Sequence, residues 1–298
     1  MSARHTTDSN THRGMEVGVR QIAPPLTREM LLPLTPDTGV VQFRTALSDR
    51  DYRQVGEWIR DYPDVLLRAE PVYDRSIMDL EFLRYFPTVK RFSLDASWFT
   101  LGSLDGLGYL SPDTDTLHIG RTRKRLSLSP LRRFSGLRRL YLDGATRDLD
   151  VLSELVALDS LTLRSVTLPD LRSLRSLTSL RALELKLGGI TNLNGIGEVG
   201  DIRYLELSRI FGFHDLTPVH ELSNLECLCL QSLPRIRRLP DLRRLPNLRE
   251  LHLEEMPGLS EDELRSLPPG IQVGSGWSRP ILTQDLTPSG IRVHAQDD

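Results

Sequence analysis

A short apolar pattern that recurs along the chain constrains the fold more than any other feature. The pattern is clearest at residues 236–253, which read IRRLPDLRRLPNLRELHL. Apolar residues fall three apart as far as Leu251, and the spacing then drops to two at Leu253. A period of two predicts a strand with both leucines on one face. A period of three is too short for an amphipathic α-helix, and Pro240 and Pro246 exclude a long one, so this part suits 3₁₀ turns or extended segments.

The same unit is repeated through most of the chain. The last apolar residue of each copy falls at Leu94, Ile119, Leu142, Leu163, Leu185, Leu207, Leu230, Leu253 and Val273. Successive copies are therefore 20 to 25 residues apart. Self-similarity at such a period predicts a solenoid, because a unit that is apolar on one side can bury that side only against copies of itself.

The L-x-x-L-x-L pattern at about 22-residue spacing resembles that of leucine-rich-repeat proteins. The three-spaced segment, as in IMDLEFLRYFPTVKRFSL at residues 77–94, resembles the short repeats of phosphatase-regulatory subunits and bacterial internalins. The resemblance covers about residues 65–275. It implies an α/β solenoid, a curved superhelix with a parallel β-sheet on the concave side and 3₁₀ or irregular segments on the convex side. It also implies that partners bind on the concave face.

One departure from the family concerns the turn after each strand. The family usually places asparagine three residues after the last strand leucine, where its side chain bonds neighbouring backbones. Here the equivalent positions hold Ala145, Val166, Gly188, Ile210, Leu233 and Met256. The turn must therefore satisfy its backbone polar groups by other means. We also find neither the signal sequence nor the wall anchor of secreted internalins, and we do not expect a host-invasion role.

We expect four regions along the chain. In order these are a disordered lead (1–20), an N-terminal cap (21–76), the leucine-rich-repeat array (77–273) and a C-terminal tail (274–298). Within the cap we expect a loop, an α-helix at residues 48–61 that begins with a capping box of Ser48 and Asp51, and a following strand. A helix and strand at this point would cover the open end of the solenoid.

Composition excludes several classes of function. The 298 residues carry a formal net charge of −2, which argues against a general nucleic-acid binder. No stretch approaches the roughly 20 apolar residues of a membrane span. With two cysteines and no signal-peptide core, we expect a cytoplasmic, bacterial-style monomer. No phosphate-binding loop, dinucleotide motif or nucleophile elbow is present, so we expect no enzyme activity, no cofactor and no metal.

If the strand leucines point into the core, the residues between them face the concave side. Arginines on this face lie mainly in the N-terminal half and glutamates in the C-terminal half, so the face would select a partner of complementary charge. Tyrosines there are candidate anchors. The predicted partner-binding residues are Arg91, His118, Arg139, Tyr141, Glu184, Tyr204, Glu206, Cys229, Glu250 and His252. The alternative, that these are simply solvated positions, remains open.

Five of the concave positions carry metal-ligand side chains on three adjacent expected strands. They are Glu206, Cys227, Cys229, Glu250 and His252. Zinc takes such ligands in a tetrahedron. However, the cysteines are two positions apart on the strand, a distance of about 6.5 Å, and a flat sheet splays its side chains. We therefore expect neither a metal site nor a disulfide here.

The sequence is best interpreted as a non-enzymatic protein–protein interaction module that binds a protein partner of unknown identity. An inhibitor or immunity-type protein that blocks a specific enzyme is the first alternative. A metal-dependent enzyme using Cys227, Cys229 and His252 is a weaker one.

Overall fold

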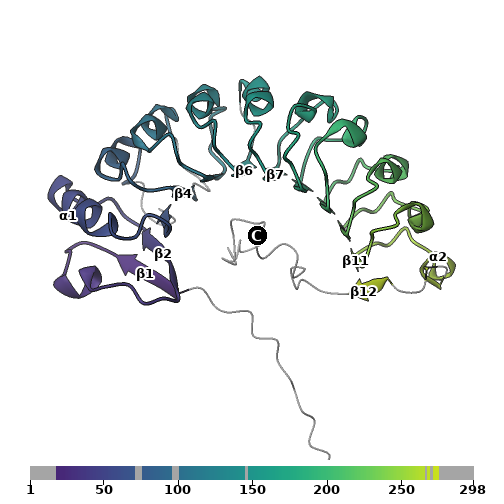
Figure 1. Cartoon of the computed structure of the whole chain (residues 1–298), viewed down its shortest axis with the longest axis horizontal. Coiled ribbons are helices and arrows are strands. Elements are labelled where there is room, and N and C mark those ends of the chain that lie inside the picture. The colour runs from purple at the N-terminus through teal and green to yellow at the C-terminus, as the bar shows by residue number, and fades with distance from the viewer. Residues whose placement is uncertain are drawn as a thin grey trace, which may run out of the picture.

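The computed structural model describes residues 18–70, 76–95, 101–144, 147–265, 267–268 and 271–274. These residues form one twelve-stranded sheet whose strands follow one another in chain order. Every neighbouring pair of strands is parallel. The sheet lines the inner side of an arc, and short helices form the outer side (Figure 1). The predicted leucine-rich-repeat solenoid with a concave parallel sheet is confirmed.

The strands are β1 (Gly18–Ile22), β2 (Thr38–Phe43), β3 (Leu66–Ala69), β4 (Arg91–Leu94), β5 (Thr116–Ile119), β6 (Arg139–Asp143), β7 (Ser160–Arg164), β8 (Ala182–Lys186), β9 (Tyr204–Ser208), β10 (Cys227–Gln231), β11 (Glu250–Glu254) and β12 (Gln272–Gly274). The α-helices are α1 (Asp49–Ile59) and α2 (Glu261–Arg265). The 3₁₀ helices are η1 (Arg28–Leu31), η2 (Glu81–Tyr85), η3 (Asp105–Tyr109), η4 (Ser129–Arg133), η5 (Leu149–Glu154), η6 (Arg172–Leu174), η7 (Ile196–Glu198), η8 (Thr217–Glu221) and η9 (Leu242–Arg244).

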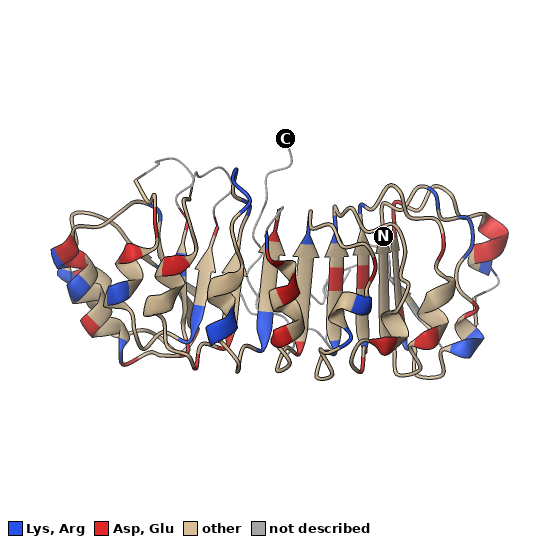
Figure 2. Ribbon diagram, turned by 90° about the horizontal axis from the view of Figure 1, so that it is seen from above, with Lys and Arg blue, Asp and Glu red and all other residues tan. Residues whose placement is uncertain are grey.

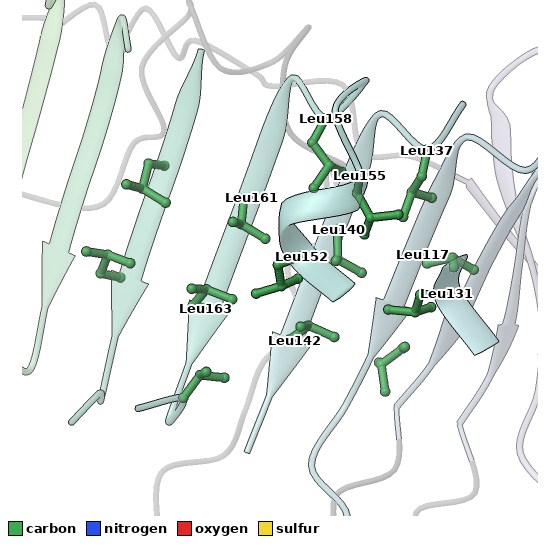
Figure 3. Packing of buried hydrophobic residues seen from close by; sticks show 14 of the residues in the cluster. Leu117, Leu131, Leu137, Leu140, Leu142, Leu152, Leu155, Leu158, Leu161 and Leu163 are labelled. Carbon is green, nitrogen blue, oxygen red and sulfur yellow. The ribbon is translucent and has the colours of Figure 1, made fainter. Parts of the chain in front are cut away.

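The three-residue leucine spacing produces the 3₁₀ helices of the convex side. In η4 the Leu131 amide donates to the Leu128 carbonyl at 2.9 Å, and the Phe134 amide donates to the Leu131 carbonyl at 3.0 Å. With three residues per turn, every third side chain points to the same side, toward the sheet. Figure 3 shows Leu131 and Leu152 from these turns packed beside the strand leucines. This core runs continuously along the arc, and its members are almost fully buried.

The turns after β6 to β10 use backbone hydrogen bonds where the family usually has asparagine. From β6 to β11, one residue per turn has a positive φ, in the series Gly144, Ser165, Leu187, Arg209, Ser232 and Glu255. The amide of each of the first five donates to the carbonyl of the last strand residue in the next repeat, at 2.8–2.9 Å. The position that follows is then free to hold an apolar side chain, and Val166, Ile210 and Leu233 are buried there at 0–1% exposure. Ala145 lies outside the described residues.

The N-terminal region contains the predicted helix but adds strands to the sheet. Helix α1 begins after Ser48, whose hydroxyl accepts a hydrogen bond from the Asp51 amide at 3.1 Å, as expected. Strand β1 then contradicts the disordered lead over residues 18–20, whereas residues 1–17 lie outside the described part. Helix α1 lies in the convex row between β2 and β3, and β1 forms the edge of the sheet (Figure 1). The expected helix–strand cap is therefore not confirmed.

Strand β1 escaped the sequence reasoning because an arginine occupies a core position. The register aligns Arg20 with Val41, and Val41 with Leu67, in the row that holds strand leucines elsewhere. The Arg20 guanidinium donates from Nη1 to the carbonyls of Met30 and Leu32, each at 3.1 Å. The guanidinium thus satisfies backbone carbonyls at the end of η1. Because Arg20 is charged, the apolar alternation that predicts a strand is interrupted at this position.

The C-terminal end of the array is formed by helix α2 and strand β12. Ser260 accepts a hydrogen bond from the Glu263 amide at 3.2 Å at the start of α2, and β12 pairs with β11. Residues 275–298 of the expected tail lie outside the described part. Among the described residues, no helix has the length and apolar character needed to cross a membrane.

Candidate functional site

The concave face consists of the strand residues that alternate with the core leucines. The register aligns them in rows that cross the sheet, one of which joins Ser93, His118 and Tyr141, and continues to Glu206, Cys229 and His252. All ten predicted partner-binding residues lie on this face, as the alternation indicates. Their role in binding stays a prediction. Their surroundings differ between the N-terminal, middle and C-terminal parts of the arc.

The N-terminal part is organised by a buried arginine, Arg68 on β3, at 6% exposure. Its Nη1 donates to Oε1 of Gln42, and its Nη2 donates to Oε1 of Glu70, both at 2.9 Å. Its Nε donates to Asp95, which also accepts a hydrogen bond from the Ser93 hydroxyl at 3.0 Å. A buried guanidinium that is matched by carboxylates and an amide is held in one orientation. We call this group the Arg68 cluster.

The middle part carries an aromatic pair. The rings of His118 on β5 and Tyr141 on β6 have centroids 4.0 Å apart. Burial lowers the pKa of His118, and the Asp95 carboxylate, 3.6 Å from its Nδ1, offsets this only in part. Burial also raises the pKa of Tyr141 to about 12. Both rings are therefore neutral at pH 7, and the tilted pair combines apolar area with polar edges.

Half-exposed arginines surround this pair. Arg91 and Arg139 are the first residues of β4 and β6 and lie in one row with Thr116. Arg164 is the last residue of β7 and pairs with Asp143. The Arg91 side chain is 38% exposed and that of Arg164 is 28% exposed. We call Arg91, His118, Arg139, Tyr141 and Arg164 the central strip. Its strands, β4 to β7, occupy the middle of the arc (Figure 1).

The C-terminal part begins with a buried lysine. Nζ of Lys186 lies 2.7 Å from Oε2 of Glu184 and 2.9 Å from Oε1 of Glu206. The Tyr204 hydroxyl donates to Oε2 of Glu206 at 3.0 Å. Burial raises the pKa of Glu206 despite the lysine, and the two carboxylates raise the pKa of Lys186 despite its burial. We call these four residues the Lys186 cluster. Figure 2 shows acidic (red) and basic (blue) positions on the strands of the sheet.

The two predicted tyrosine anchors differ in burial. Tyr204 is only 4% exposed, and Glu184 and Glu206 are 4% and 5% exposed. Their side chains contact one another beneath the surface that a partner can reach. Tyr141 is half-buried and remains accessible. The predicted charge polarity is present, but many of these charges are already paired within the chain.

Cys227 and Cys229 on β10 and His252 on β11 are the described residues that could hold a metal. Their ligand atoms all lie within 4.8 Å of one another. The two sulfur atoms are 3.8 Å apart, so the expectation that the sheet splays them too far apart is wrong. Both cysteines lie on β10, so the rotamers of their side chains, and not the curvature across the strands, bring the two sulfur atoms together.

Comparison with known proteins bears on the fold. No protein-family model and no curated protein matches the sequence. A solved internalin F from Listeria monocytogenes is 16% identical, with coverage of 80% of this chain and 79% of that chain, at a TM-score of 0.51. A Leptospira interrogans leucine-rich-repeat protein is 21% identical, at a TM-score of 0.51. The fold is that of a leucine-rich-repeat protein.

The likenesses differ in how much of each chain they cover. The alignment with the Leptospira protein covers 78% of this chain but 58% of that chain. Internalin C2 from Listeria monocytogenes is 25% identical, with 66% of this chain and 84% of that chain covered, at a TM-score of 0.48.

The sequence reasoning missed the N-terminal end of the concave face. Gln21, Gln42 and Arg68 extend the row that contains Ser93 and His118. The Gln42 side chain donates a hydrogen bond to the Gln21 side chain at 3.0 Å. The available signal was the alternation of Leu67 and Ala69, which places Arg68 between two core residues. Residues 21–76 are expected to form a cap, so the strand that holds Arg68 is not expected in the sheet of the repeats.

Proposed function

We propose that this protein is a non-enzymatic interaction module that binds a protein partner through the central strip of its concave face. The observation that carries the proposal is the contrast in exposure along the sheet. The Arg68 and Lys186 clusters are closed by their own hydrogen bonds and ion pairs, whereas the Arg91 and Arg164 side chains of the central strip between them are 38% and 28% exposed. Leucine-rich-repeat solenoids are protein-interaction scaffolds, and their curvature creates extended concave binding surfaces.

The chemistry of the central strip suits a protein surface. Tyrosine and arginine are the side chains that most often carry binding energy, because they combine large contact area with directed hydrogen bonds. Arginine also binds carboxylates in a two-point geometry. We therefore expect a partner that presents acidic groups around an apolar or aromatic centre. The sheet beneath the strip is already ordered, so binding needs little rearrangement.

Affinity capture with matched surface variants tests the proposal. Purified protein and its Tyr141→Ala and Arg139→Glu variants are used as bait, and binding of the captured partner is then measured by calorimetry. We expect a loss of about tenfold or more for each variant, as for interface hot spots. The control is Arg132→Glu on the convex helix η4, which carries the same charge change on the opposite side of the repeat.

Unchanged affinity in both concave variants, with all four proteins equally stable, would contradict the central strip as the binding site. Once a partner is known, its activity with and without this protein distinguishes a scaffold from an inhibitor or immunity-type protein.

A further inference from the structure

The strands β10 and β11 bring two thiols and an imidazole together on the concave face. Cys227 and Cys229 lie two apart on β10, and the register aligns Cys229 with His252. The two Sγ atoms are 3.8 Å apart, and the ligand nitrogen of His252 lies within 4.8 Å of both. From this geometry we propose that Cys227, Cys229 and His252 bind a divalent transition metal of the zinc class.

The sulfur separation agrees with the geometry that zinc imposes. Two thiolates at about 2.3 Å from a tetrahedral zinc ion are about 3.8 Å from each other. The matching distance between a thiolate sulfur and an imidazole nitrogen is about 3.5 Å. The imidazole must therefore approach by no more than about 1.3 Å, which rotation of a half-buried side chain supplies. Thiolate and imidazole ligands together favour zinc over hard cations such as magnesium or calcium.

A neighbouring carboxylate supports the histidine as a ligand. Nε2 of His252 lies 3.2 Å from Oε2 of Glu250. When Nε2 donates this hydrogen bond to the carboxylate, Nδ1 carries the lone pair that a metal needs. Histidine ligands in metal sites are commonly oriented by a carboxylate in this way. Glu250 also lies in register with Cys227, so its negative charge adjoins the dication as well as the ring.

Because these three residues supply three ligands, a bound zinc ion would take its fourth ligand from water or from another molecule. Glu206 lies in register with Cys229, but one of its carboxylate oxygens contacts Lys186 and the other accepts from Tyr204. It is therefore occupied within the Lys186 cluster. Three protein ligands with one open position are the arrangement in which zinc retains an exchangeable ligand. This site does not depend on partner binding at the central strip.

Cobalt titration of the untagged full chain tests the site. The protein is first reduced with a phosphine and kept without oxygen, and Co²⁺ is the probe because thiolate-bound cobalt gives a charge-transfer band and tetrahedral cobalt gives visible bands. We expect both signals to saturate at one Co²⁺ per chain and to disappear when one equivalent of Zn²⁺ is added. Cys229→Ser and His252→Gln should each lose stoichiometric binding.

Two further variants sharpen the test. Glu250→Gln should bind Co²⁺ about 10- to 100-fold more weakly, as for other groups that orient a histidine ligand. His214→Gln removes an exposed histidine outside the site and should titrate like the parent protein. Circular dichroism confirms that each variant is folded. If Cys229→Ser does not fold, the half-buried His252→Gln carries the test.

Three results would overturn the proposal. The parent protein could show no charge-transfer band at millimolar Co²⁺. The band could persist unchanged in Cys229→Ser and His252→Gln. Alkylation and mass measurement of the phosphine-treated protein could show a Cys227–Cys229 disulfide, which would remove both thiolates.

Discussion

At the scale of single residues, Lys186 determines how the concave face tolerates two buried glutamates. Its side chain is 15% exposed, and the side chains of Glu184 and Glu206 are 5% and 6% exposed. An ion pair of this kind adds little net stability, because both partners lose their water. Removing one partner is costly, because the other charge is left buried without compensation.

Replacing this lysine with an apolar side chain should therefore be strongly destabilising. We expect Lys186→Met to lower the free energy of unfolding by about 3–5 kcal/mol at pH 7, measured by urea denaturation. Adding Glu184→Gln and Glu206→Gln to the same protein should restore part of the loss. The control Arg172→Met breaks a pair in which the arginine is 55% exposed, and it should change stability by less than about 1 kcal/mol. Equal losses in Lys186→Met and Arg172→Met would contradict this account.

The two concave tyrosines show how far sequence reasoning reaches at this scale. Strand alternation places both Tyr141 and Tyr204 on the concave face, and the register confirms it. Alternation does not say how a side chain lies on that face. The Tyr204 hydroxyl donates to Glu206 on its own strand and is buried, whereas Tyr141 packs against His118 at a tilted angle and stays accessible. Glu206 is in turn held by Lys186 of the neighbouring strand β8, a contact that alternation within one strand does not reveal.

At the scale of the repeat element, the turn after each of the strands β6 to β11 contains one residue with a positive φ. Gly144 adopts φ 95°, and non-glycine residues such as Leu187 adopt φ near 50° in the later repeats. An L-residue in this region costs roughly 1–2 kcal/mol. Backbone hydrogen bonds to the next repeat, such as that from the Leu187 amide to the Ser208 carbonyl at 2.9 Å, offset this cost.

A pair of glycine substitutions isolates this conformational cost. A Cβ added at Gly144 would meet Arg121 no closer than 3.5 Å, so the backbone angle rather than a clash determines the effect. We expect Gly144→Ala to lower the free energy of unfolding by about 1 kcal/mol in urea denaturation. At Gly136 a Cβ would meet nothing within 4 Å and φ is not positive, so Gly136→Ala should be neutral or stabilising by about 0.4–1 kcal/mol. If Gly144→Ala were as stable as Gly136→Ala, the turn would not need the left-handed conformation.

The repeat elements show why most of the fold was predictable and the N-terminal end was not. Leucine spacing of two specifies the strands and spacing of three specifies the 3₁₀ helices, so the elements from Ile77 onward follow from the pattern. Strand β1 breaks the pattern with Arg20, and β2 and β3 are separated by a true α-helix. Backbone pairing places β1, β2 and β3 in the same sheet as the repeats. The spacing of apolar side chains does not show which strands pair.

At the scale of the whole molecule, the sheet is open at both ends and each strand pairs only with its neighbours among the described residues. In such an array, stability is approximately a sum over repeats and the interfaces between them. The central strip on β4 to β7 lies far from either edge. The Cys227, Cys229 and His252 group lies on the last strands before β12, where opening needs fewer interfaces to break.

Two leucines with the same burial at different positions test this one-dimensional coupling. Leu161 on β7 and Leu251 on β11 are both 0% exposed, and each leucine-to-alanine change should cost about 2–5 kcal/mol locally. By hydrogen exchange, Leu251→Ala should lose amide protection in β11 and β12 while β3 to β7 keep theirs. Leu161→Ala should lose protection on both sides of β7 and weaken any binding at the central strip. A uniform loss over all strands in both variants would mean that the array opens as one cooperative unit, because the interfaces between repeats would then be stronger than the repeats themselves.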